Sequence, residues 1–178
     1  FDPKYKGGYR SWWGFETLPE VNEETPSFVE FITGEGGVID TWLRRGAAGF
    51  RLDVADELPD DFIEKIRTAV KRVSPEKFLL GEVWEDATTK YGFGQRRTYL
   101  LGKGLDSVMN YPFKNAVLDF VKGKPAQQAM GEILSICEHY PAPAMDTALN
   151  FLSTHDTERA LTVIADEPAN GRGREWQS

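Results

Sequence analysis

A charge pair lies inside a stretch that otherwise has the pattern of a buried strand, "GFRLDVADEL". Arg51 and Asp53 alternate there with three apolar residues. Because alternate side chains of a strand point to the same face, the arginine and the aspartate share one face. An isolated pair of this kind is more often a solvated edge or a structural ion pair, so its meaning depends on the rest of the chain.

Two further acids follow other apolar runs. Glu82 stands near the end of "KFLLGEVW", and the pair His155 and Asp156 follows "ALNFLST". If these runs are parallel strands, Asp53, Glu82 and Asp156 meet at one edge of the sheet. Burying an unpaired carboxylate costs on the order of several kcal/mol, so three of them at one edge indicate a functional site.

The surroundings of the first two acids differ. Arg51 favours the ionised form of Asp53, whereas Glu82 has apolar neighbours and no basic residue beside it in the sequence, so burial should favour its protonated form. Glycoside hydrolysis needs such a pair, because a carboxylate attacks the anomeric carbon while a carboxylic acid protonates the leaving oxygen. Asp156 with His155 is then expected to hold sugar hydroxyls and to stabilise the oxocarbenium-like transition state.

Alternating strands and helices must position these acids. A helix is predicted to begin at Thr25-Pro26, and another over residues 60–73 has acids at its start and bases at its end. Further helices are expected from Pro112, over 125–140 and over 157–165. Four strands that alternate with helices predict an α/β fold with a parallel sheet, either open or closed into a barrel.

Composition excludes several other classes of protein. The 178 residues carry a net charge of −7, which argues against binding nucleic acid or an anionic membrane through a basic surface. The single cysteine, Cys137, fits an apolar helix face and cannot form an internal disulfide, and no Cys/His cluster indicates a zinc site. No glycine-rich nucleotide motif and no membrane-spanning run is present. The sequence leaves the compartment open, with the cytoplasm slightly favoured.

The same segments resemble the α-amylase family of glycoside hydrolases, in particular its neopullulanase and cyclomaltodextrinase-like members. "GFRLDVADE" is similar to the family's nucleophile segment, "GEVW" to the acid/base segment, and "FLSTHDTER" to the segment of the stabilising aspartate. "LPEVN", "SWWGF" and "DSVMNYPF" also resemble this branch. The resemblance implies three catalytic residues, Asp53, Glu82 and Asp156. We expect four substrate-binding residues, Arg51, His155, Trp84 and Tyr111.

The resemblance implies a partial TIM (β/α)8 barrel over residues 1–178, about strands four to seven with their helices. Residues 1–24 would be the loop preceding the fourth barrel strand. The family's third-strand segment and the eighth strand are not found, and a complete barrel has roughly 250 residues. We therefore expect a piece of a longer protein, inactive or very weak alone, that self-associates through open strand edges. No cofactor is assigned to the chain, and the resemblance allows calcium in a full-length parent.

The expected reaction is retaining hydrolysis of α-glucan oligosaccharides or polysaccharides such as starch, maltooligosaccharides, pullulan or cyclodextrins. The sequence does not choose among α-1,4 hydrolysis, α-1,6 hydrolysis and transglycosylation. Two alternatives stay open: a non-catalytic carbohydrate-binding remnant, and a magnesium-dependent enolase-like barrel enzyme. In the second, the ligands would be Asp53, Glu82 and Asp106, although Asp106 stands near the start of its predicted strand.

Overall fold

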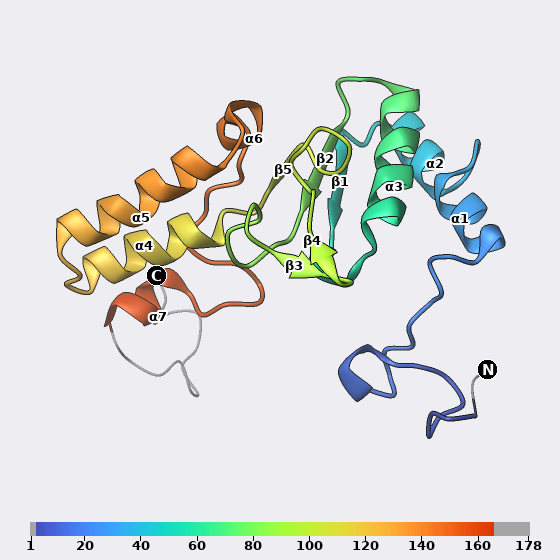
Figure 1. Ribbon diagram of the computed structural model, residues 1–178, viewed down its shortest axis with the longest axis horizontal. Helices are drawn as coiled ribbons and strands as arrows, with labels where there is room; N and C mark the ends of the chain where they lie inside the picture. Colours follow the sequence, from blue (N-terminus) through green and yellow to red (C-terminus); the bar gives the residue numbers. More distant parts are fainter. Residues whose placement is uncertain (1–2, 166–178) are drawn as a thin grey trace.

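The centre of the computed structural model, which describes residues 3–165, is a parallel three-stranded sheet in the order β1-β2-β5 (Figure 1). The strands are β1 (Gly49–Leu52), β2 (Phe78–Gly81) and β5 (Ser107–Val108). In the register, Leu52 lies opposite Gly81, so β1 and β2 end at the same level. The residues that follow these two strands therefore emerge side by side.

The two faces of the sheet contact different apolar clusters, because successive strand residues point to opposite faces. Leu79 is fully buried in the main core, together with residues of the helices that cover one face. Leu80 belongs to a smaller cluster with Met109 and Tyr111 on the other side. A strand that is buried on both faces is typical of a parallel α/β sheet.

Three helices cover the face on which Leu79 lies (Figure 1). They are α1 (Pro26–Thr33), α2 (Val38–Arg44) and α3 (Asp60–Val73). Proline at the first position starts α1 as predicted, and Gly34 caps its C-terminal end. α3 has Asp60 and Asp61 in its first turn and basic residues in its last, which suits the helix dipole. Its buried stripe runs from Phe62 to Val70.

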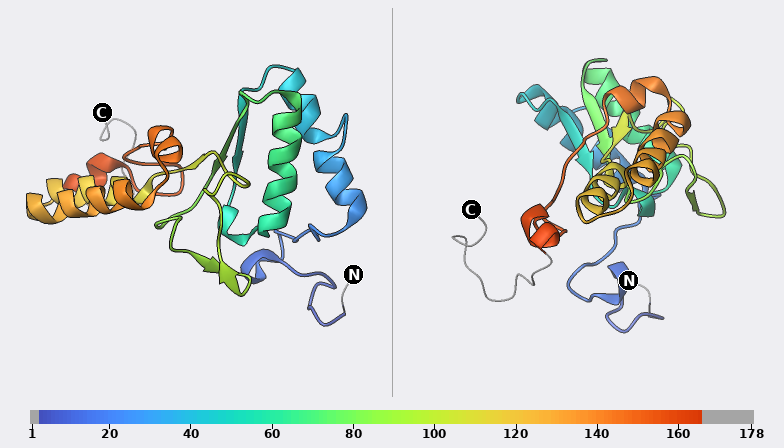
Figure 2. Two further views of the ribbon diagram at one scale, coloured as in Figure 1. Left: turned by 45° about the horizontal axis from the view of Figure 1, so that its top comes forward. Right: turned by 90° about the vertical axis from the view of Figure 1, so that its left-hand side faces the viewer.

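The second half of the chain is mostly helical. α4 (Tyr111–Val121) and α5 (Ala126–His139) lie side by side and extend away from the sheet (Figures 1 and 2). The short helices α6 (Ala142–Asp146) and α7 (Ala160–Ala165) follow. Asn110 caps α4, because its side chain accepts a hydrogen bond from the Phe113 N–H at 3.1 Å. No helix within residues 3–165 is long and apolar enough to cross a membrane.

The predicted fourth strand is present only as one parallel bridge between Met109 and Leu149. The Leu149 N–H donates to the Val108 carbonyl at 3.1 Å, and the Asn110 N–H donates to the Leu149 carbonyl at 2.9 Å. The prediction of four full strands is therefore wrong. β5 has only two residues before the helix cap at Asn110, so it offers little backbone for pairing.

The carboxyl end of the sheet carries two structures that the sequence did not indicate. One is a hairpin of β3 (Tyr91–Gly92) and β4 (Gln95–Arg96). The other is a turn of 3₁₀-helix, η1 (Trp12–Gly14), in the N-terminal loop. Both lie beyond the ends of β1 and β2 (Figure 1). A second 3₁₀ turn, η2 (Ala55–Glu57), directly follows the first strand's end.

Candidate functional site

Asp53 and Glu82 directly follow β1 and β2, so the sheet brings the two carboxylates to one edge. Asp53 is largely exposed, with 76% of its side chain accessible. Glu82 is buried, with 4% of the residue accessible. The burial of Glu82 that its apolar neighbours indicated is therefore present, and the difference in protonation between the two acids stays a prediction.

Glu82 is held by donors from three different elements. Its Oε2 accepts a hydrogen bond from the Val54 backbone N–H at 2.8 Å. Its Oε1 accepts one from the Trp84 indole N–H at 3.0 Å, and the Tyr111 hydroxyl donates to the same oxygen at 3.5 Å. These contacts fix the carboxyl group in one orientation towards the strand ends.

Val54, whose N–H donates to Glu82, has a left-handed backbone with φ of 43°. A β-branched residue rarely adopts this conformation, which costs on the order of 1–3 kcal/mol. The neighbouring backbone holds it in place: the Ala55 N–H donates to the Glu82 carbonyl at 3.1 Å, and the Glu82 N–H to the Leu52 carbonyl at 3.0 Å. This backbone keeps the Val54 N–H within hydrogen-bonding distance of the Glu82 carboxylate.

Arg51 joins the two carboxylates through one guanidinium group. Its Nη1 donates to Asp53 Oδ1, and its Nη2 lies 3.2 Å from Glu82 Oε1. The predicted pairing of Arg51 with Asp53 is present. Glu82 has no basic neighbour in the sequence, but the parallel register brings Arg51 of the adjacent strand beside it.

Trp84 and Tyr111 form an aromatic stack next to Glu82. Their ring centroids are 4.5 Å apart and nearly parallel, and Phe151 contacts Tyr111 edge-on at 4.8 Å. Trp84 is 45% exposed, so it offers a ring face to a ligand. The Tyr111 ring is buried, which leaves its hydroxyl as the group that faces the site. Both stay predicted substrate-binding residues.

Asp156 acts electrostatically on the Tyr111 hydroxyl, which also donates to Glu82. Burial raises the pKa of the Tyr111 hydroxyl, a hydrogen bond with Thr154 opposes this rise, and the charges of Glu82 and Asp156 add to it. Asp156 itself is partly exposed, with Oδ2 3.0 Å from His155 Nε2. The side chains of Asp156 and His155 therefore pair with each other. Their catalytic and binding roles stay predictions.

Asp106 does not join the strand-end acids, which removes the geometric basis of the enolase-like alternative. Its carboxylate accepts hydrogen bonds from Arg67 at 2.7 Å, Lys71 at 2.8 Å and the Leu79 N–H at 2.8 Å. It thus lies at the amino end of β5, level with Leu79. Among residues 3–165, no group of three His, Cys, Asp or Glu side chains is placed to hold a metal ion. The calcium ion of a full-length parent stays a prediction.

Arg97 is a buried residue near the site that the sequence did not single out. Its guanidinium donates to the carbonyls of Asp56 and Leu58, both at 2.6 Å, and to Asp60 Oδ1 at 2.8 Å. It therefore clamps the η2 segment behind Asp53. No local pattern marks Arg97 in the sequence, since its partners lie about 40 residues away.

Glu57 of η2 accepts a hydrogen bond from the Trp13 indole N–H at 2.6 Å. This contact ties the N-terminal loop to η2. Trp13 itself is largely exposed. The contact joins residues 44 positions apart, and "SWWGF" was the one signal that could have suggested it.

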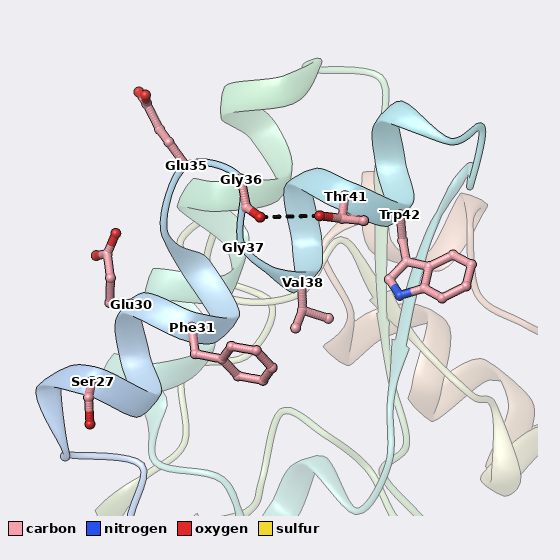
Figure 3. Close-up of a pocket in the computed structure, with 9 residues that line it drawn as sticks. All are labelled: Ser27, Glu30, Phe31, Glu35, Gly36, Gly37, Val38, Thr41 and Trp42. Atoms are coloured by element: carbon pink, nitrogen blue, oxygen red, sulfur yellow. Dashed lines mark hydrogen bonds between the residues drawn. The ribbon is translucent and has the colours of Figure 1, made fainter.

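A hollow of about 560 Å³ lies elsewhere, between α1 and α2 (Figure 3). Phe31 and Trp42 flank it, and the Thr41 hydroxyl donates to the Gly36 carbonyl across the link between the helices. Its lining within the described residues comes only from α1, α2 and this link. It is therefore separate from the strand-end carboxylates.

Comparison with known proteins gives a family match over nearly the whole chain. A model of the alpha amylase catalytic domain matches residues 6–175. The chain is 34% identical over 201 aligned residues to an amylopullulanase of Thermoanaerobacter thermohydrosulfuricus, covering 97% of this chain and 13% of that protein. It is 37% identical over 155 residues to a cyclomaltodextrinase of Bacillus sp, covering 83% and 25%.

Solved structures agree with these matches. A cyclic alpha-maltosyl-(1→6)-maltose hydrolase from Arthrobacter globiformis has a TM-score of 0.79 at 29% identity, covering 89% of this chain and 34% of that chain. A structure named cyclomaltodextrinase has a TM-score of 0.76 at 35% identity, covering 88% and 25%. The chain therefore spans between about an eighth and a third of the length of these relatives.

Proposed function

Because this chain belongs to the alpha-amylase family, whose catalytic domain is a TIM barrel, we propose that it is the catalytic portion of an α-glucan glycoside hydrolase. The resemblance read from the sequence motifs is confirmed by the family match. The finer assignment, in which β1, β2, β5 and the Leu149 segment correspond to barrel strands four to seven, is part of this proposal. The consecutive parallel order of these strands supports it.

One observation carries the proposed chemistry: a single guanidinium, that of Arg51, contacts both Asp53 and Glu82 at adjacent strand ends. We assign Asp53 as the nucleophile, since it is exposed at the strand end and paired with the Arg51 guanidinium. We assign Glu82 as the acid/base, since its fixed orientation suits proton transfer to a leaving oxygen. Asp156 would stabilise the positive charge that develops on the sugar ring.

The same contact supports a retaining mechanism. Retaining glycosidases have their two carboxyl groups about 5–5.5 Å apart, whereas inverting ones leave room for a water at about 6.5–9.5 Å. Two carboxylates on the two terminal nitrogens of one guanidinium favour the shorter separation. The reaction then passes through a glycosyl ester on Asp53, which Glu82 helps water to hydrolyse.

The proposed substrates are neutral α-glucans. Two of the relatives are named amylopullulanase and cyclomaltodextrinase, names that refer to pullulan and to cyclic maltodextrins. The exposed face of Trp84 beside Glu82 suits the apolar face of a glucose ring, and Arg51, Tyr111 and His155 offer polar contacts. We propose α-glucan binding by these residues and leave the choice of linkage to experiment.

The decisive experiment uses a longer protein that carries this chain within a complete catalytic barrel. Asp53→Asn should abolish hydrolysis of pullulan, starch and cyclodextrins, because the nucleophile is lost. Asp119→Asn, which removes an exposed acid on α4, is the matched control and should keep activity. Proton NMR of the first product should show retention of the anomeric configuration. Near-normal turnover by Asp53→Asn would overturn the assignment, and glucan binding without turnover by the unmutated protein would favour a non-catalytic role.

A further inference from the structure

The non-glycine residues with a left-handed backbone in residues 3–165 are Trp13, Val54 and Phe93. Trp13 lies in η1, Val54 directly precedes η2 after β1, and Phe93 lies in the loop between β3 and β4. The Val54 N–H donates a hydrogen bond to Glu82. Trp13 and Phe93 are aromatic, and they are 77% and 61% exposed. Backbone strain of this kind persists where surrounding structure enforces it, and it gathers at ligand-binding sites. The two exposed rings therefore call for a functional reason.

The Phe93 conformation is not explained by its turn. Gly92 pairs with Gln95, so Phe93 and Gly94 form a two-residue hairpin loop. Both have positive φ, 52° and 77°, which makes a type I′ turn. Asparagine followed by glycine is the pair that this turn favours, whereas a bulky aromatic residue is strained at its first position. The chain keeps a large exposed ring where a small polar side chain would fit better.

Phe93 lines a groove of about 880 Å³ on this rim of the molecule. The groove lies between the N-terminal loop, the start of α3 and the β3–β4 hairpin, and Tyr5 and Tyr9 also line it. Its volume is within the range of about 300–1,000 Å³ that small-molecule sites occupy. It is thus large enough for more than one ring of an oligosaccharide.

The charges around this groove indicate the class of ligand. Five carboxylates line it against two basic side chains, with the amides of Asn22 and Gln95 between them. This excess of negative charge disfavours the binding of anionic polymers. Carboxylates and amides accept hydrogen bonds from hydroxyl groups, and exposed aromatic rings pack against the apolar C–H face of a pyranose. A neutral polyhydroxylated chain fits both features.

We propose that this groove binds glucose units of an α-glucan outside the catalytic carboxylates, with Phe93 as its stacking platform. The substrate class rests on the proposed function. The groove is coupled to the site through Arg97, whose guanidinium lies 5.2 Å from the Phe93 ring centroid and donates to the carbonyls of Asp56 and Leu58 behind Asp53. A glucan held here would extend over the same rim as Asp53.

The test measures maltoheptaose binding to the 178-residue chain by titration calorimetry, with the melting temperature of each variant recorded in parallel. Phe93→Asn removes the ring and suits the type I′ turn, so it should weaken binding about three- to tenfold while the melting temperature stays equal or rises. Phe93→Tyr keeps a ring and should bind within about twofold of the unmutated chain. Trp42→Ala removes an exposed ring from the separate hollow between α1 and α2 and should leave affinity unchanged.

Three outcomes would overturn the inference: no binding of maltoheptaose, equal binding by Phe93→Asn, or a loss of affinity in Trp42→Ala instead. A change in oligomeric state in Phe93→Asn with unchanged affinity would show that the ring packs against another copy, and would also overturn it. The result is separable from the proposed function, since binding is read without turnover. A complete protein that fails to hydrolyse glucans but loses affinity in Phe93→Asn would leave the groove assignment standing.

Discussion

At the scale of single residues, a small number of side chains hold the two carboxylates of the site in place. Arg51 contacts Asp53 and Glu82, while Trp84 combines a hydrogen bond to Glu82 with a ring stacked on Tyr111. Charge-assisted hydrogen bonds to a buried carboxyl contribute about 1.5–3 kcal/mol each, so losing one should change its orientation and reactivity. Substitutions that separate the polar from the aromatic role of Trp84 are therefore informative.

Trp84→Phe keeps the aromatic stack and removes the indole N–H. In a longer protein with a complete barrel, we expect kcat to fall by roughly tenfold, because Glu82 loses one of the bonds that orient it. KM should change little, since the ring face stays. Trp84→Leu, which also removes the ring, should raise KM as well. Steady-state kinetics on maltooligosaccharides measure both constants. An unchanged kcat in Trp84→Phe would show that the N–H does not serve the chemistry.

At the scale of elements, two ionic contacts, a buried one at Arg97 and a half-buried one at Asp106, attach the loops, helices and strands to each other. Arg97 clamps η2 to the segment after the β3–β4 hairpin, and the stacked Tyr99 ring lies 4.3 Å from its guanidinium. Asp106 joins α3 to the sheet through Arg67 and Lys71. Removing one partner from such a buried contact leaves the other groups without hydrogen bonds, which costs far more than losing an exposed pair.

Arg97→Met should lower the free energy of unfolding by about 3–5 kcal/mol, because Asp60 and several backbone carbonyls lose their donor. Arg44→Met is the matched control. It removes an exposed arginine that lies 3.7 Å from Asp40, and should change stability by about 1 kcal/mol or less. Urea denaturation followed by circular dichroism gives both values. Equal losses of stability in the two variants would show that the buried hydrogen bonds of Arg97 do not stabilise the fold more than an exposed ion pair does.

Asp106 should make stability depend on acid pH. Burial alone would raise the pKa of its carboxyl, but hydrogen bonds from Lys71, Arg67 and the Leu79 N–H lower it below the ordinary 3.8. A lowered carboxyl pKa adds stability that is present above the ordinary value and is lost as pH falls through the folded-state value. Asp106→Asn should therefore be less stable than the unmutated chain at pH 7.

The difference between Asp106→Asn and the unmutated chain should begin to shrink as pH falls below about 3.8, and it should be lost as pH falls through the lower folded-state pKa of Asp106. Urea unfolding at a series of pH values from 7 to 3 measures this convergence. Asp61→Asn, at an exposed acid in the first turn of α3, is the comparison and should show a smaller pH dependence. A constant difference across the series would mean that Asp106 stabilises the fold by packing rather than by charge.

At the scale of the whole molecule, the sheet ends in open edges. Among the described residues, β1 pairs only with β2, and the segment at Leu149 pairs only with β5. Phe31 and Trp42 add exposed apolar surface on the helices that flank β1. Unpaired strand edges and exposed apolar faces favour association with another chain.

We expect the isolated 178-residue chain to self-associate and to hydrolyse α-glucans very weakly or not at all. Another copy is the available partner for the open edges, and small displacements of catalytic groups lower rates by large factors. Light scattering over a range of concentrations, together with a maltooligosaccharide hydrolysis assay, measures both properties. A stable monomer with ordinary enzymatic turnover would contradict this expectation.

The sequence by itself determined the features that depend on short range. Apolar runs followed by acids located Asp53 and Glu82 at strand ends, and helical periodicity with caps located α1, α3 and α5, because these patterns reflect hydrogen bonding and burial within a few residues. Only the tertiary structure decided what depends on distant partners. Arg51 meets Glu82 through strand register, and Arg97 meets η2 across about 40 residues. The predicted fourth strand forms only a single bridge at Leu149. Strand pairing needs a neighbouring strand of sufficient length, and β5 has only two residues.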